Sequence, residues 1–421
     1  MIMQDNEKKP ALRFKGFTDP WEQRKLGDAF ERVVRKNTNN ESRLPLTISA
    51  QDGLVDQITY FNNRVASRDV SNYYLVYNGE FAYNKSTSDG YPFGAVKRLD
   101  WYEKGVLSTL YIVFALKHPE KDDSDFMTVF YDTDRWHRGV AERAAEGARN
   151  HGLLNISADD FFDIDTTMPE DKAEQEKIGR LLKKLDTLIT LHQRKYEKLV
   201  NIKKSMLDKM FPKNGASVPE IRFKGFTDPW EQRKLGDAFE RVVRKNTNNE
   251  SRLPLTISAQ DGLVDQITYF NNRVASRDVS NYYLVYNGEF AYNKSTSDGY
   301  PFGAVKRLDW YEKGVLSTLY IVFALKHPEK DDSDFMTVFY DTDRWHRGVA
   351  ERAAEGARNH GLLNISADDF FDIDTTMPED KAEQEKIGRL LKKLDTLITL
   401  HQRKLEKLQN IKKSCLEKMF V

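Results

Sequence analysis

The sequence has almost no cysteine, since Cys415 is the only one among its 421 residues. An internal disulfide and a cysteine zinc cluster are therefore excluded. Long apolar runs are also missing: no stretch of about 18 apolar residues could span a bilayer, and the opening MIMQDNEKKP lacks the apolar segment of a signal peptide. We expect a soluble, cytoplasmic protein with no membrane partner.

An excess of charge is absent as well, because 65 Lys and Arg residues balance 65 Asp and Glu residues. The high isoelectric point typical of nucleic-acid-binding domains is therefore lacking. The sequence contains no glycine-rich phosphate loop, no Gly-x-Ser-x-Gly motif and no HExxH motif. Its histidines are not spaced as metal ligands, and the Asn/Asp-Pro-Pro-aromatic motif of an amino-methyltransferase is missing. These absences argue against an enzyme and against a metal bound by this chain.

What the sequence does contain is a long internal repeat. Residues 13–195 recur as residues 222–404, with no substitution over 183 positions. Folding alone does not require such identity, because cores tolerate volume-conserving changes. Two identical folding units that pack through a shared element would behave like a covalent two-fold dimer.

The first part of each repeat, 13–168, is predicted to be a mixed α+β domain. Strands are expected at 44–50, 73–77, 80–83 and 106–116, and Asn78-Gly79 predicts a hairpin between the second and third. The alanines of segment 133–151 favour a helix there. Polar, glycine-containing loops separate these elements, so the domain is expected to hold long surface loops on a rigid scaffold.

The second part, 169–211, is predicted to be one long helix. Pro169 suits a first turn, and acidic residues follow it where the helix dipole favours them. An apolar stripe runs from Ile178 to Met210 at alternating spacings of four and three, with polar residues at His192 and Lys203. A helix from about Lys172 to Met210 would be about 58 Å long, and its natural partner is the corresponding stripe of the second copy. An ordinary dimerisation coiled coil is the alternative interpretation.

The apolar stripe is wider than a two-helix coil requires, so some of it is expected to bind another protein. The expected partner-binding residues are Leu181, Leu188, Leu191, Ile202, Leu390, Leu397, Leu400 and Ile411.

Basic residues gather locally although the domain as a whole is acidic. Residues 13–168 hold 20 basic and 24 acidic residues, net −4, whereas 169–211 hold 11 and 7, net +4. Arginine can bind guanine with two hydrogen bonds, and loops on a scaffold often carry binding residues. Solvated surface arginines are the alternative. The expected DNA contacts are Lys85, Tyr91, Lys97, Arg98, Arg135, Arg138, Arg143 and Arg149, with their copies Lys294, Tyr300, Lys306, Arg307, Arg344, Arg347, Arg352 and Arg358.

One acidic cluster is similar to part of a metal-dependent nuclease. Asp163, Asp165 and Glu170 precede Lys172, and two-metal chemistry needs clustered carboxylates. Helix-start acids explain Glu170 without a metal, so a nuclease is kept only as a minor alternative.

Several segments together resemble the specificity subunit of type I restriction-modification systems. They are Arg13-Phe14-Lys15-Gly16-Phe17 with Trp21-Glu22 and Lys25-Leu26-Gly27-Asp28, then Gly152-Leu153-Leu154-Asn155-Ile156-Ser157 with Asp160-Phe161-Phe162, then Pro169, Glu174-Gln175-x-Lys177-Ile178 and Leu185-Asp186-x-Leu188-Ile189, and finally Lys203-Lys204-Ser205-Met206-Leu207 with Met210-Phe211. No single motif is specific, but their order, spacing and doubling are, and they cover nearly the whole chain.

The resemblance implies an α+β fold in which two mixed α/β target-recognition domains are joined by two long antiparallel coiled-coil spacer helices, with pseudo-two-fold symmetry. The expected boundaries are 13–168 and 222–377 for the recognition domains, 169–211 and 378–421 for the spacers, and 212–221 for the linker. The interior of the recognition domain can be reshuffled between family members, so no contact residue is carried over.

The resemblance also implies partners. Such subunits read a bipartite double-stranded DNA site and carry two methyltransferase subunits for adenine-N6 methylation and two motor-nuclease subunits. S-adenosylmethionine, ATP and Mg²⁺ would then bind to those partners, and no cofactor to this chain. Family members usually have two different recognition domains, whereas these two are identical, so we expect an interrupted palindrome as the target. A regulator that binds DNA alone through two-fold symmetry is the alternative, and the surplus apolar helix surface argues against it.

Overall fold

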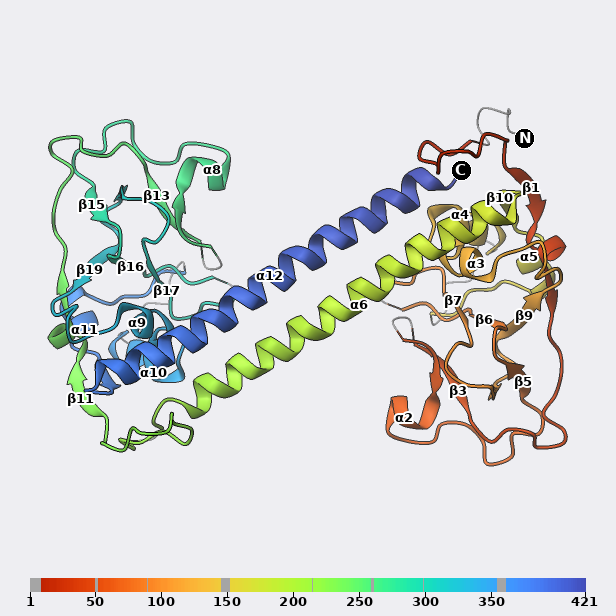
Figure 1. The fold of residues 1–421 in the computed structure, drawn as a ribbon, viewed down its shortest axis with the longest axis horizontal. Coiled ribbons are helices and arrows are strands. Elements are labelled where there is room, and N and C mark those ends of the chain that lie inside the picture. The colour runs from red at the N-terminus through yellow and green to blue at the C-terminus, as the bar shows by residue number, and fades with distance from the viewer. Residues whose placement is uncertain are drawn as a thin grey trace. The chain divides into compact units, whose positions relative to one another are not determined.

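The structure is a computed structural model that describes residues 9–49, 52–88, 90–144, 152–213, 215–258, 261–297, 299–353 and 361–421. By its internal contacts the chain divides into two units. One comprises Met1–Gln193 with Arg403–Val421, and the other comprises Arg194–Gln402. Each unit therefore contains one globular domain, the first part of the long helix that follows that domain, and the last part of the other long helix (Figure 1).

The two copies fold into the same series of elements. In the first copy these are β1 (Glu22–Lys25), α1 (Leu26–Ala29), β2 (Phe30–Arg32), β3 (Leu46–Ser49), β4 (Gly53–Asp56), α2 (Gln57–Phe61), β5 (Tyr74–Tyr77), β6 (Phe81–Asn84), β7 (Ala95–Arg98), β8 (Lys104–Leu107), β9 (Ile112–Leu116), α3 (Ser124–Phe130), α4 (Asp134–Arg143), α5 (Ala158–Phe162), β10 (Asp165–Met168) and α6 (Lys172–Lys209).

The second copy repeats this order. Its elements are β11 (Glu231–Lys234), α7 (Leu235–Ala238), β12 (Phe239–Arg241), β13 (Leu255–Ser258), β14 (Gly262–Asp265), α8 (Gln266–Phe270), β15 (Tyr283–Tyr286), β16 (Phe290–Asn293), β17 (Ala304–Arg307), β18 (Lys313–Leu316), β19 (Ile321–Leu325), α9 (Ser333–Phe339), α10 (Asp343–Arg352), α11 (Ala367–Phe371), β20 (Asp374–Met377) and α12 (Lys381–Met419).

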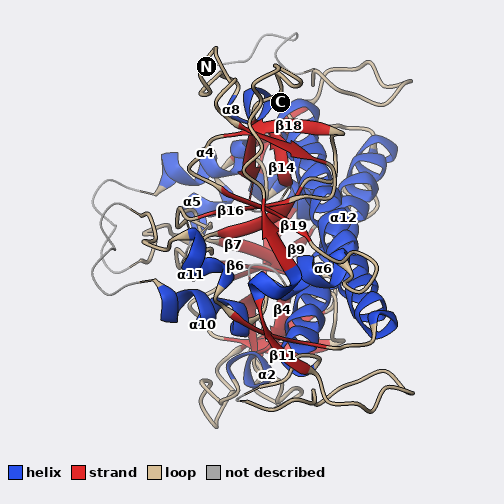
Figure 2. Cartoon of the chain, turned by 90° about the vertical axis from the view of Figure 1, so that its left-hand side faces the viewer, coloured by secondary structure: helices blue, strands red, loops and turns tan. Residues whose placement is uncertain are grey.

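The centre of each domain is a four-stranded antiparallel sheet, ordered β2-β9-β6-β7 in the first copy. Because side chains alternate across a strand, the sheet has two different faces. Phe81 and Tyr83 pack with helices α3, α4, α5 and α6 in one core, whereas Ala82 packs with the small sheets β3-β4 and β5-β8 in another. Figure 2 shows the strands in red and the helices in blue.

The predicted hairpin at Asn78-Gly79 is wrong. The turn itself forms, with Gly79 at φ +86° and the Glu80 amide donating to the Tyr77 carbonyl at 3.1 Å. However, β5 pairs with β8, whereas β6 pairs with β7 and β9. The Asn78 and Gly79 amides donate to the carbonyls of Glu103 and Leu99, so the turn leads from one sheet into another.

The predicted single strand 106–116 is two strands. A turn follows β8, in which the Tyr111 amide donates to the Ser108 carbonyl at 3.2 Å, and Leu110 is 76% exposed. The apolar run 106–116 thus contributes a strand to each of two sheets, because β8 pairs with β5 and β9 lies between β2 and β6.

The long helices begin and end close to the predicted residues. At the start of α6 the Asp171 carboxylate accepts from the Ala173 amide at 2.8 Å, which satisfies a donor that the first turn leaves unpaired. Gly179 allows close packing, because a Cβ there would lie 2.6 Å from the amide nitrogen of Phe126 on α3. No helix in the described ranges is long and apolar enough to cross a membrane.

The end of each long helix packs on the domain of the other copy. In the first unit, Phe420 makes an edge contact with Trp21 at 5.9 Å and stacks on Phe126 at 5.4 Å. The Leu12 amide also donates to the Lys418 carbonyl at 2.8 Å. In the second unit Phe211 packs in the same way on Trp230 and Phe335. Inside each unit, therefore, the start of one helix packs beside the end of the other, and the two segments are antiparallel.

The expected α+β fold is confirmed, with two mixed domains and two long helices.

Candidate nucleic-acid interface

Helix α4 supplies the central basic residues of each domain. Thr133 caps its start, since its hydroxyl accepts from the Trp136 amide at 3.3 Å. Trp136 and Val140 are fully buried and fix one face of the helix against the core. Trp136 is therefore a core residue.

The opposite face of α4 presents Arg135 and Arg138. Arg138 is exposed and Arg135 is half-buried. Burial lowers the pKa of Arg135, and the neighbouring Arg138 charge lowers it further. Two adjacent guanidinium groups that repel one another form a favourable position for an anion or for an acceptor-rich base edge.

The loop between β6 and β7 rests on this helix. The Tyr83 hydroxyl donates to the Phe93 carbonyl at 2.9 Å, and the Phe93 ring stacks on His137 at 5.2 Å. Tyr91 and Lys97 come from the same loop and its following strand, with the Lys97 ammonium 5.8 Å from the Tyr91 ring centroid. Burial raises the pKa of Tyr91, so its phenol stays protonated at neutral pH.

These groups line one cavity of about 580 Å³ in the first unit, which we call the readout groove. Its walls are residues of the 90–97 loop, residues 131–138, Asp186 and Ile189 of α6, and 409–420 at the end of the chain. In the second unit, Arg344 and Arg347 line a cavity of about 560 Å³ together with residues 200–213. In the first unit the structure thus brings Tyr91, Lys97, Arg135 and Arg138 together.

Three other predicted DNA contacts have partners inside the domain. Lys85 donates to the Ile156 carbonyl at 3.2 Å. Arg98 donates to Asp100 at 2.6 Å, to Asp125 at 2.8 Å and to the Ser124 hydroxyl. Arg143 donates to the Asp163 carboxylate at 2.7 Å. Their roles as DNA contacts stay predictions, and the structure gives each of them a folding role.

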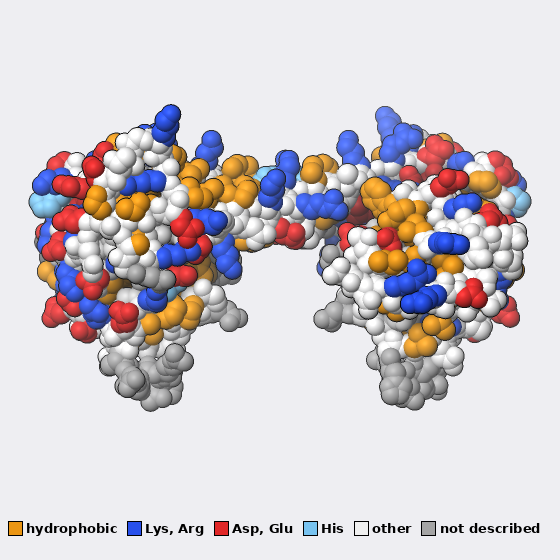
Figure 3. Space-filling view, turned by 90° about the horizontal axis from the view of Figure 1, so that it is seen from below, with side chains coloured by type: hydrophobic (Ala, Val, Ile, Leu, Met, Phe, Trp, Pro, Cys, Tyr) orange, Lys and Arg blue, Asp and Glu red, His pale blue; other side chains and the backbone are white. Residues whose placement is uncertain are grey.

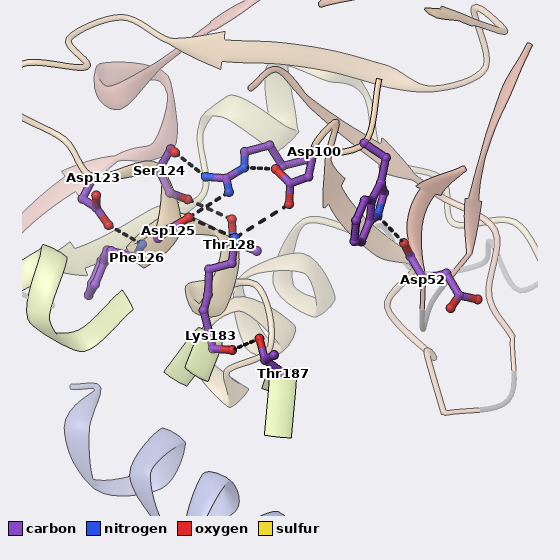
Figure 4. Close-up of polar contacts among 11 residues, drawn as sticks. Asp52, Asp100, Asp123, Ser124, Asp125, Phe126, Thr128, Lys183 and Thr187 are labelled. Carbon is purple, nitrogen blue, oxygen red and sulfur yellow. Dashed lines mark hydrogen bonds and ion pairs between the residues drawn. The ribbon is translucent and has the colours of Figure 1, made fainter. Parts of the chain in front are cut away.

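Arg98 belongs to a network that joins the domain to its own long helix. Lys183 of α6 lies 3.0 Å from the Asp125 carboxylate and 3.7 Å from that of Asp100 (Figure 4). Arg98 holds the same two carboxylates, so the two cations and two anions neutralise one another at the surface between domain and helix.

The second copy repeats these contacts. Lys294 donates to the Ile365 carbonyl, Arg307 to Asp309, and Arg352 to Asp372. Lys306 lies 5.8 Å from the Tyr300 ring. Arg149 and Arg358 lie outside the described residues.

Sequence reasoning missed a charged cluster beside the readout groove. The Lys412 ammonium lies 2.7 Å from the Asp132 carboxylate and 2.7 Å from that of Asp186. Lys203 is placed in the same way between Asp341 and Asp395, at 2.6 Å from each. The signal was present in the sequence, because Lys203 interrupts the apolar stripe of its helix.

The carboxylates of the nuclease alternative are largely paired with cations. Lys25 lies 3.3 Å from Asp163 and 2.9 Å from Asp165, and Arg143 also holds Asp163. Within the described ranges no group of three or more His, Cys, Asp or Glu side chains could hold a metal ion.

On the face shown in Figure 3, basic side chains occur in small clusters among acidic and apolar ones. This mixed surface agrees with the net charge of −4 for each domain. Binding to DNA through this surface would depend on particular contacts more than on a general positive field.

Comparison with solved structures identifies the fold. The crystal structure of the type I restriction-modification system S subunit from M. genitalium superposes with a TM-score of 0.62 over 98% of this chain and 99% of that chain, at 13% identity. The chain has the fold of a type I restriction-modification S subunit. The HsdS subunit from Thermoanaerobacter tengcongensis, at 15% identity over 95% and 96% of the two chains, gives a TM-score of 0.40.

A structure titled for complex assembly and conformational transition of the type I R-M system, also at 15% identity, covers 94% of this chain and 97% of that chain with a TM-score of 0.39. No protein-family model matches the sequence. A search of curated proteins also finds no match.

On this S-subunit fold, the expected partner-binding positions lie along α6 and α12 and differ in exposure. Leu181 and Leu390 are partly buried against the domain cores. Leu191 and Leu400 are 45% and 57% exposed, and Ile411 is 40% exposed. The intermediate positions, neither buried nor fully exposed, are Leu188, Ile202 and Leu397.

Proposed function

We propose that this chain is the DNA-recognition subunit of a type I restriction-modification complex. The observation that carries the proposal is the likeness to an S subunit over the full length of both chains. The readout groove adds support, since its lining includes Tyr91, Lys97, Arg135 and Arg138.

Residues 13–168 and 222–377 are proposed as the two target-recognition domains, and 169–211 and 378–421 as the spacers between them. Because the domains are identical in sequence, each should read the same bases. A two-fold arrangement then makes the target an interrupted palindrome, with two inverted half-sites and an unspecified gap. Two linked half-sites are needed for specificity, because each mismatched base pair costs only about 1–3 kcal/mol.

The catalytic work is assigned to partners in this proposal. Two methyltransferase subunits would bind S-adenosylmethionine and methylate adenine, and two motor-nuclease subunits would bind ATP and Mg²⁺. The exposed Leu191 and Leu400 leave apolar surface on the long helices that another protein would cover.

The test is to express the chain with the methyltransferase encoded beside it and to sequence the host DNA for methylated adenines. We expect one interrupted palindromic motif that disappears when this chain is omitted. An asymmetric motif would contradict the palindrome. Methylation that does not depend on this chain would contradict the recognition role, and tight site-specific binding without any methyltransferase would favour the regulator instead.

A further inference from the structure

A lysine that links three separate segments of the chain lines the readout groove of the first unit and the cavity of the second. In the first unit Asp132 precedes Thr133, the capping residue of α4, while Asp186 lies on α6 and Lys412 lies on α12. One ammonium group therefore joins the start of the basic helix α4 to both long helices.

The lysine is largely buried, whereas its partners Asp132 and Asp186 are 33% and 42% exposed. The Lys412 side chain is 18% exposed, and Lys203 is 17% exposed. Burial opposes the charge of Lys412, but the Asp132 and Asp186 carboxylates outweigh it and raise its pKa to about 12. The cluster therefore keeps its cation at neutral pH.

The position of this lysine is unfavourable for simple helix packing. It occupies the apolar stripe, where a leucine or methionine would pack without desolvating a charge. A polar residue in such a stripe commonly fixes the register of packed helices. A shift of α12 by one residue would move Lys412 by about 1.5 Å along the helix axis and lengthen its bonds to both carboxylates.

We propose that Lys412 and Lys203 are positioning residues that fix helices α4 and α10 relative to the long helices and thereby set the gap between the half-sites. This inference rests on the proposed function and adds a specific device to it. Half-site bases are read by other side chains, so loss of the lysine should relax the gap while the half-site sequence stays the same.

The neighbouring lysines provide a matched control. Lys413 lines the same groove but is 76% exposed, and its ion pair with Glu417 is long at 4.0 Å. Its copy Lys204 lines the second cavity. Replacing Lys413 and Lys204 removes the same charge from the same helix ends without breaking the link to α4 or α10.

The experiment uses the full chain in complex with its co-expressed methyltransferase to select bound fragments from random-sequence DNA duplexes, which are then sequenced. The variants are Lys412→Met with Lys203→Met, and as control Lys413→Met with Lys204→Met. Wild type should enrich paired half-sites at one gap length. The positioning variant should keep the half-site, while its preference for that gap over gaps one base pair shorter or longer falls at least threefold. The control should lose affinity only.

If the lysine variants fail to fold, the more conservative double variant Asp132→Asn with Asp341→Asn tests the same inference. It removes the carboxylate on the domain side and leaves each lysine paired with the aspartate of the other long helix, Asp186 or Asp395, so a relaxed gap is again expected. An unchanged gap preference in a folded positioning variant, or an equal relaxation in the control, would overturn the inference. If wild type enriches no paired half-sites, the proposed function itself fails.

Discussion

At the scale of single residues, the structure separates arginines that support the fold from arginines that can reach a ligand. Arg98 and Arg143 hold carboxylates of their own domain. Arg135 and Arg138 lie on one face of α4 and line the readout groove. Composition could not make this distinction, because all four stand in similar basic and polar surroundings in the sequence.

The first prediction concerns Arg138 and its copy. The double variant Arg138→Ala with Arg347→Ala should weaken binding to the methylated motif at least tenfold, because each half-site loses a guanidinium contact. Arg43→Ala with Arg252→Ala removes the same charge from exposed positions that do not line these cavities and should leave affinity nearly unchanged. Fluorescence anisotropy at fixed salt measures both. Equal losses in the two variants would show a general charge effect.

The second prediction concerns the pH dependence of Lys412→Met. Removing the ammonium leaves the Asp132 and Asp186 carboxylates, which are 33% and 42% exposed, without their shared cation. The variant should be destabilised, but by less than the cost of breaking a fully buried ion pair. Burial already raises the pKa of Asp186, and loss of the lysine should raise it further. A carboxyl whose folded-state pKa is raised destabilises the fold above that pKa, and the loss is recovered as the pH falls through it.

The deficit in melting temperature relative to wild type should therefore be larger at pH 8 than at pH 5. Calorimetry at both pH values measures the difference, with Lys413→Met as the control that should differ little at either. A deficit for Lys412→Met that stays constant between pH 8 and pH 5 would contradict this account.

At the scale of elements, the sequence predicted where strands form better than it predicted which strands pair with one another. The runs at 73–77 and 80–83 are strands as predicted, yet the Asn78-Gly79 turn leads from one sheet into another. Pairing depends on which distant strand offers free backbone groups, and here residues near Leu99 and Glu103 take the amides of the turn. Local sequence carries no information about those distant groups.

The third prediction concerns the docked helix end. Phe420→Ala should lower the free energy of unfolding by about 3 kcal/mol, because it leaves a cavity beside Trp21 and Phe126. Phe211→Ala should cost a similar amount in the other unit, since its contacts are equivalent. Phe61→Ala, at a side chain that is 50% exposed, is the control and should change little. Urea unfolding followed by tryptophan fluorescence measures all three.

At the scale of the whole molecule, the repeat and the exchanged helix ends have a joint consequence. The end of α6 does not pack on its own domain but on the second one, and the end of α12 packs on the first. Since the docking residues Trp21 and Phe126 recur as Trp230 and Phe335, either helix end fits either domain.

The fourth prediction follows from this equivalence. A chain ending after Pro212 should form a stable homodimer, because Met210 and Phe211 of each copy find the docking site of the other. Light scattering should give twice the mass of the half-chain, and Phe211→Ala should shift it toward monomer. A monomeric half-chain that remains folded would contradict the exchange of helix ends.

The sequence by itself determined the two-copy organisation, the extent of the long helices and the absence of disulfides, because identity, heptad spacing and cysteine count can be read along the chain. Only the tertiary structure decided which basic residues share the readout groove and which domain each helix end contacts. The physical reason is distance in sequence: Lys412 and Asp132 are 280 positions apart and meet only when the helix ends exchange. Local sequence patterns predict helices and strands, whereas the contact between Lys412 and Asp132 depends on how the whole chain folds.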